Sequence, residues 1–213
     1  MTKVYCWAPI IDPQQEAADY GMKKLMTNVA GLGALWKKDA GIEFVKPGLS
    51  IMSGSYDIAA AAGNDIIIIY GHGSEVGNTL YNYEDVGLTK CNELRARDLP
   101  KRLVEQDWLE PSNAYYFLFC VCYSGKYKEL DLLTGPSTGS FIEEFRDAAR
   151  EKTYFRNSVL WGPKGVAYRE ISSFGWIEYE DDKKGKHTYA IKKLMTDGEA
   201  HINTGIGYQR IKI

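Results

Sequence analysis

The two residues best suited to covalent chemistry are a histidine and a cysteine, each placed just after a short apolar run. His72 lies between two glycines and follows the run Ile66–Tyr70. Cys122 follows the run Tyr115–Val121. A thiol beside an imidazole is a nucleophile with its own base, and it attacks carbonyl carbons to form thioesters. Acyl transfer is therefore the chemistry that these residue types predict, provided that the fold brings them together.

The apolar runs themselves indicate how this could happen. Both are short, continuous and rich in β-branched or aromatic residues, which is typical of strands buried on both faces of a parallel sheet. In such sheets, functional groups gather beyond the carboxyl ends of the strands. If the two strands are neighbours, we expect His72 and Cys122 to lie side by side at one edge of the sheet.

The remaining pattern predicts an α/β fold in one domain that spans residues 1–213. Alternating strands and helices favour a mainly parallel central sheet flanked by helices, and the last part of the chain reads as β-rich. The expected strands are residues 3–8, 42–45, 66–70, 115–121 and 158–161, the last one stopped by Gly162-Pro163. The expected helices are residues 13–28, 93–108 with a break at Pro100, and 137–152. A short helix or turn is expected over 56–62, a loop or hairpin over 74–92, and the β-rich part over 166–213.

The two short blocks resemble those of the caspase-like (clan CD) cysteine peptidases, the group of caspases, legumains, gingipains, clostripains and separases. His72-Gly73 matches the histidine block of that family, and Cys122-Tyr123-Ser124-Gly125 matches the nucleophile block, in the legumain and separase style. The two residues are 50 positions apart, and caspases show a separation of about 50. Cys120–Ser124 departs from the caspase signature Gln-Ala-Cys-Arg-Gly, so caspase substrate preference is not carried over.

The resemblance implies a caspase-like fold and a cysteine endopeptidase with a Cys122–His72 dyad and no required third member. It also implies that the backbone N–H groups of Gly73 and Cys122 form an oxyanion hole.

The same resemblance implies the substrate-binding positions, because the substrate pockets of that family lie at the end of the nucleophile strand and on the next strand. They are Cys120, Trp161 and Lys164. Two of these positions have a second interpretation. Cys120 shares a strand face with Cys122 and could equally be core packing. Lys164 is either a contact for an acidic side chain or a solvated cation.

Three other interpretations remain. Gly135–Gly139 matches G-x-S-x-G, and Ser137 with Asp182 and His187 has the chain order of a serine α/β-hydrolase, although the preceding segment is polar for a central strand. A zinc site from the histidine and cysteines has poor ligand spacing. A caspase-like fold could also serve as a non-enzymatic interaction module.

Composition favours a folded protein, and the resemblance implies a polypeptide substrate with no cofactor or metal. Hydrophobic residues make up 45% of the chain and charged residues 25%, with a net charge of −2 and no basic block, so we expect neither nucleic acid nor a membrane as partner. Four cysteines, two of them in Cys120-Val121-Cys122, favour a reducing compartment. We expect a cytoplasmic location, or secretion without a signal peptide, since the first residues lack an apolar stretch. The long connection over residues 123–137 is expected to move or to be processed.

Overall fold

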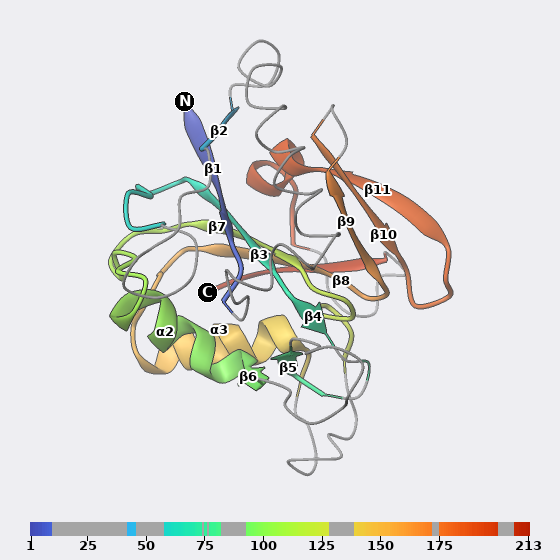
Figure 1. The fold of residues 1–213 in the computed structure, drawn as a ribbon, viewed down its shortest axis with the longest axis horizontal. Helices are drawn as coiled ribbons and strands as arrows, with labels where there is room; N and C mark the ends of the chain where they lie inside the picture. The colour runs from blue at the N-terminus through green and yellow to red at the C-terminus, as the bar shows by residue number, and fades with distance from the viewer. Residues whose placement is uncertain are drawn as a thin grey trace, which may run out of the picture.

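A six-stranded, mostly parallel sheet forms the centre of the molecule in the computed structural model (Figure 1). The model describes residues 1–9, 42–45, 58–73, 75, 77–81, 93–127, 139–171, 175–199 and 207–213. The strand order is β12-β8-β7-β3-β1-β2, in which only the edge strand β12 runs antiparallel to its neighbour. The strands are β1 (Thr2–Trp7), β2 (Ile42–Phe44), β3 (Ile66–Tyr70), β7 (Tyr116–Cys120), β8 (Val159–Pro163) and β12 (Tyr208–Lys212). The predicted α/β class with a mainly parallel sheet is confirmed.

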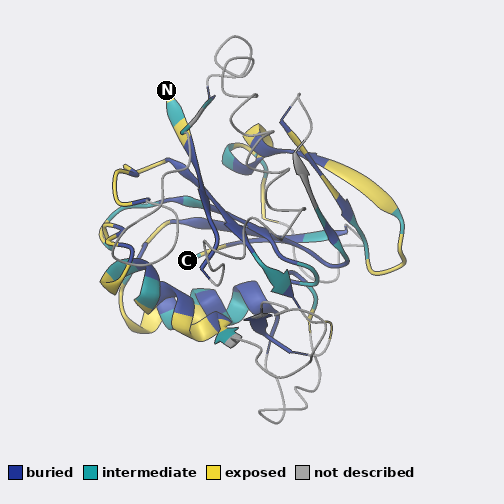
Figure 2. Ribbon diagram, in the orientation of Figure 1, coloured by how far each residue is buried: buried dark blue, intermediate teal, exposed yellow. Residues whose placement is uncertain are grey.

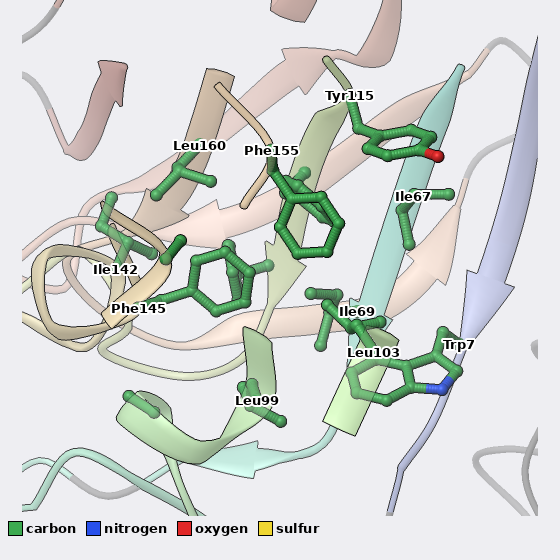
Figure 3. Packing of buried hydrophobic residues seen from close by; sticks show 14 of the residues in the cluster. Trp7, Ile67, Ile69, Leu99, Leu103, Tyr115, Ile142, Phe145, Phe155 and Leu160 are labelled. Carbon is green, nitrogen blue, oxygen red and sulfur yellow. The ribbon is translucent and has the colours of Figure 1, made fainter. Parts of the chain in front are cut away.

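Among the described residues, two helices cover one face of this sheet: α2 (Leu99–Glu105), which follows the short 3-10 turn η1 (Ala96–Asp98), and α3 (Phe141–Glu151). Their apolar side chains point onto the strands, as Leu99, Leu103 and Phe145 do in Figure 3. The ring centroids of Phe117 on β7 and Phe145 on α3 are 5.3 Å apart. Because fully burying an apolar side chain contributes about 1.5–3 kcal/mol, this layer holds the helices on the sheet.

The opposite face of the sheet is covered by a small antiparallel sheet and the 3-10 helix η2 (Ile191–Met195). Its strands are β9 (Ala167–Ile171), β10 (Trp176–Glu180) and β11 (Lys186–Ala190), in the order β11-β10-β9. Trp161 of β8 packs between the layers, with its ring 4.8 Å from Tyr189 and 5.4 Å from Tyr179. The central strands are therefore buried on both faces, as their dark colour in Figure 2 shows.

A third sheet lies at the end of β3 and consists of β4 (His72–Gly73), β5 (Thr79–Tyr81) and β6 (Glu93–Arg95). The buried Asn78 ties it to the start of α3, because its amide nitrogen donates to the Gly139 carbonyl at 3.1 Å and to Glu144 Oε1 at 2.7 Å. This small sheet carries His72.

Several local predictions need correction. Residues 93–95 were expected to be helical, but they form β6, because they pair with β5. The helix α2 begins only at Leu99. Pro100 lies in its first turn, where a proline removes no helical hydrogen bond, so it does not break the helix. Strand β8 does not stop before Gly162-Pro163 but continues through both, because β12 pairs with it there.

Other predictions have mixed outcomes. The predicted helix over 137–152 is confirmed as α3, the β-rich C-terminal part as β9 to β12, and residues 59–60 form a turn. The predicted helix over 13–28 and residues 128–137 of the long connection lie outside the described residues. Among the helices that the structure describes, none is both long enough and apolar enough to cross a membrane.

The start of α3 gives a test of stability. Ser140 caps the helix: its hydroxyl accepts from the Glu143 N–H at 3.3 Å and contacts Gln209 Oε1 at 2.6 Å, while Glu143 Oε2 accepts from the Ser140 N–H at 2.7 Å. Ser140→Ala removes the cap and leaves the buried Gln209 short of a partner, so we expect a loss of about 1–3 kcal/mol of unfolding free energy. Urea titration measures it, as a lower midpoint with an unchanged m-value.

The matched control is Ser112→Ala, since Ser112 is exposed and bonds only locally to Glu110. Equal midpoint shifts for the two variants would contradict the assigned role of Ser140.

Candidate active site

The pairing of β3 with β7 determines where His72 and Cys122 lie. These strands are parallel, and their register runs from Ile66 opposite Tyr116 to Tyr70 opposite Cys120. The pairing ends there, so His72 and Cys122 each lie two positions beyond the last paired residue of their strand. Both residues follow the carboxyl ends of adjacent parallel strands, where α/β proteins gather functional groups.

The backbone of Gly73 lies directly against that of Cys122. A Cβ atom built on Gly73 would come within 2.2 Å of the Cys122 carbonyl oxygen and 2.6 Å of Val121 Cγ1. No real side chain tolerates such distances. The glycine after His72 is therefore required for close approach of the two segments, and the short β4 strand is in contact with the residue that follows β7.

A tight turn directs the chain away after Cys122. The Ser124 N–H donates to the Val121 carbonyl at 3.3 Å, and Tyr123 between them takes a left-handed backbone conformation with φ 60°. The Tyr123 N–H donates to the Gly165 carbonyl at 2.7 Å, which fixes the turn against the connection between β8 and β9. Such strain in a non-glycine residue persists only where its surroundings hold it, and it concentrates at functional sites.

Accessibility separates the three cysteines that the structure describes. Cys6 and Cys120 are buried in the core, whereas Cys122 is half-buried, and its Sγ lies 3.9 Å from the Ala167 carbonyl oxygen of β9. Burial raises the pKa of the Cys6 thiol to about 12 and holds the pKa of Cys120 well above its usual range. These two thiols stay protonated and inert near neutral pH, so among the described cysteines only Cys122 is placed to react.

Polar side chains surround the Cys122 turn on its solvent side. Tyr168 of β9 donates its hydroxyl to Glu180, and this bond, with a smaller contribution from burial, raises the pKa of Tyr168. Lys126 forms an ion pair with Glu75 and lies over the Tyr123 ring, 5.7 Å from its centroid. Beyond Tyr168 an open polar hollow lies on the small sheet, lined by Tyr168, Glu178, Tyr179, Lys186, His187 and Thr188.

The predicted substrate-binding residues are all buried in this structure. The exposed fraction of Trp161 is 0%, that of Cys120 is 3% and that of Lys164 is 5%. The small sheet β9-β10-β11 is packed over this face of β7 and β8, so the side chains of Cys120 and Trp161 belong to the core. Burial also lowers the pKa of Lys164, with an opposing effect from Asp182. The structure thus brings Gly73, the neighbour of His72, against Cys122, and it leaves Cys120, Trp161 and Lys164 beneath the surface.

Residues at the site that sequence reasoning missed come from the adjoining loops and from β9 and β10: Glu75, Lys126, Tyr168 and Glu180. Glu75 and Lys126 carried a local signal, because each follows one of the two reactive blocks within four positions. Tyr168 and Glu180 carried none, since only the pairing of β9 with β10 sets them beside each other.

The serine-hydrolase alternative rests on residues that the structure covers only in part. Ser137 lies outside the described residues. His187 Nε2 bonds to Asp181 Oδ2 at 2.8 Å, and its ring stacks on Tyr179. Its carboxylate partner is therefore Asp181, the neighbour of the predicted Asp182, on an exposed hairpin.

Comparison with known proteins adds no relative: no protein-family model matches the chain, and no curated protein matches its sequence.

The contact at Gly73 gives a test of the site geometry. Gly73→Ala forces β4 away from Cys122, because backbone and Val121 atoms block the new methyl group. We expect a loss of about 1–3 kcal/mol of unfolding free energy, typical of overpacking, together with altered reactivity of the Cys122 thiol. Thermal unfolding and the rate of Cys122 alkylation by iodoacetamide, followed by peptide mass spectrometry, measure both effects.

Gly198→Ala is the matched control, since nothing lies within 4 Å of the position that its Cβ would take. If Gly73→Ala behaves like this control, then the two segments are not in contact.

Proposed function

We propose that this protein is a cysteine endopeptidase of caspase-like architecture, in which Cys122 is the nucleophile and His72 is the general acid–base. One observation carries the proposal: Gly73, the residue after His72, packs against the Cys122 carbonyl, next to the paired ends of β3 and β7. A half-buried thiol at the end of a central parallel strand, next to a histidine, has the placement that acyl transfer requires.

The reaction follows from these positions. His72 takes the Cys122 thiol proton, and the thiolate forms a bond to the carbonyl carbon of the scissile peptide, whose oxygen becomes an oxyanion. Collapse of this intermediate breaks the carbon–nitrogen bond, and the imidazolium of His72 gives its proton to the leaving amine. Water then attacks the thioester with His72 as base, releases the new carboxylate and restores the thiol.

The backbone N–H groups of Gly73 and Cys122 are proposed to stabilise the oxyanion. The segments that carry these two N–H groups lie in contact, which supports this role. A donor of this kind contributes about 10²–10³ in rate.

The architecture supports the caspase-like assignment without deciding it. The two reactive blocks follow neighbouring strands in the middle of a parallel sheet, helices cover one face, and a small antiparallel sheet follows β8 along the chain. We propose a polypeptide as the substrate, and a reducing compartment as the site of action, because the mechanism needs a free Cys122 thiol.

Replacing the proposed nucleophile is the direct test. Cys122→Ala should abolish cleavage of a diverse peptide mixture, read by mass spectrometry, because no other described thiol is placed to attack. Its unfolding midpoint should stay near that of the wild type, since only one sulfur atom at a half-buried position is lost. Cys120→Ser is the control and should retain measurable cleavage. Activity in Cys122→Ala together with inactivity in Cys120→Ser would assign the wrong cysteine.

The histidine has its own test. His72→Ala should lower kcat/KM by at least the ~10²–10⁴ typical of general acid–base catalysis. His187→Ala is the control, because His187 lies on an exposed hairpin paired with Asp181. A comparable loss in His187→Ala, with His72→Ala unaffected, would favour the serine-hydrolase alternative instead.

A further inference from the structure

The loops that follow His72 and Cys122 are joined to each other by an ion pair. Glu75 lies three positions after His72, and Lys126 lies four positions after Cys122. Lys126 Nζ contacts Glu75 Oε1, with side-chain exposed fractions of 32% for the lysine and 56% for the glutamate. These two residues are 51 positions apart in sequence, so the pair is a tertiary link between the reactive segments.

Lys126 also holds the strained residue next to the proposed nucleophile. Its ammonium lies 5.7 Å from the centroid of the Tyr123 ring, where a cation is attracted by the face of an aromatic ring. Its backbone N–H donates to the Tyr123 carbonyl at 3.1 Å. Tyr123 has φ 60°, a left-handed conformation that is unfavourable for a non-glycine residue. Its contacts with Lys126 help to stabilise this conformation.

Together these contacts close a ring of interactions around the site. It runs from His72 along the chain to Glu75, across the ion pair to Lys126, on to Tyr123, and back to Cys122. Gly73 packed against Cys122 closes the other side. The ion pair therefore links the turn after Cys122 to the segment after His72.

We propose that Glu75 and Lys126 are positioning residues: their ion pair, with the Lys126–Tyr123 contact, sets the orientation of Cys122 relative to His72. This inference deepens the proposed function and rests on it for its catalytic meaning. Neither residue touches the reacting atoms, so both act through Tyr123 and the two loops. Exposed ion pairs contribute little, and the expected effects are correspondingly modest.

The experiment measures the alkylation rate of Cys122 by iodoacetamide in the full-length protein, with peptide mass spectrometry to assign the modified cysteine. Glu75→Gln and Lys126→Met should each slow alkylation about two- to five-fold. Lys126→Arg should keep the wild-type rate, because it preserves both the ion pair and the cation over Tyr123. The exchanged pair, Glu75→Lys with Lys126→Glu, should recover only part of the rate, because no cation then remains over the ring.

Salt provides a second readout, which a purely structural role would not move. Raising ionic strength toward 1 M shortens the screening length to about 3 Å, so the wild-type alkylation rate should fall toward that of Lys126→Met, which should itself respond weakly. Glu105→Gln is the matched control: it removes an exposed ion pair with Lys101 of 3.7 Å on α2 and should leave Cys122 alkylation unchanged. Thermal unfolding of every variant separates altered positioning from loss of fold.

The outcomes distinguish the two proposals. Alkylation rates that do not differ among wild type, Glu75→Gln and Lys126→Met, in folded proteins, overturn the positioning role, even if Cys122→Ala still abolishes peptide cleavage. Rates that follow the ion pair, in a protein that cleaves no peptide, support the positioning role and overturn the peptidase. Equal slowing by Glu105→Gln would also overturn the positioning role, because the effect would then not depend on the Glu75–Lys126 ion pair.

Discussion

The parallel hydrogen bonding between β3 and β7 is the constraint on which the rest of this structure depends. It joins two strands that are 50 positions apart in sequence and ends their pairing at Tyr70 and Cys120. A slip of one residue would turn every side chain on either strand to the other face, and both faces are buried, so the register is strongly specified. His72 and Cys122 each follow the end of one of these paired strands by two positions, so the core fixes where both segments begin.

The two covered faces of the sheet give the cysteines different chemical properties. Helices α2 and α3 cover one face with aromatic and aliphatic side chains, and the small sheet with η2 covers the other. Cys6 and Cys120 lie inside the second layer, where burial keeps their thiols protonated. Cys122 lies two positions beyond the end of β7 and is only half-buried. Because the residue type is the same at all three positions, the expected reactivity of each thiol depends on its burial, and Cys122 is accessible because β7 ends before it.

Close backbone approach supports the site from two sides. Gly73 has no space for a Cβ beside Cys122, and Gly125 has none beside the Gly162 carbonyl, where the distance would be 2.2 Å. The turn between Val121 and Gly125 is therefore held between β4 and the end of β8. The Gly125 N–H donates to the Pro163 carbonyl at 2.8 Å, which fixes the exit of the turn to the neighbouring strand. Held in such a turn, the proposed nucleophile Cys122 would need little reorganisation when a substrate carbonyl arrives.

The sequence by itself determined the α/β class, the two apolar strands and the placement of His72 and Cys122 at their ends, because continuous β-branched and aromatic runs bounded by glycine have few other structures open to them. It also placed α3, whose capping serine and apolar stripe are local signals. Only the tertiary structure decided that residues 93–95 pair as a strand, that β8 continues through Pro163, and that the small sheet buries Trp161 and Cys120. Those outcomes depend on partners far along the chain, such as β5 and β12, whose pairing leaves no trace in local residue patterns. The Glu75–Lys126 ion pair belongs to the same group: its two charges are visible in the sequence, but only the β3–β7 register brings them together.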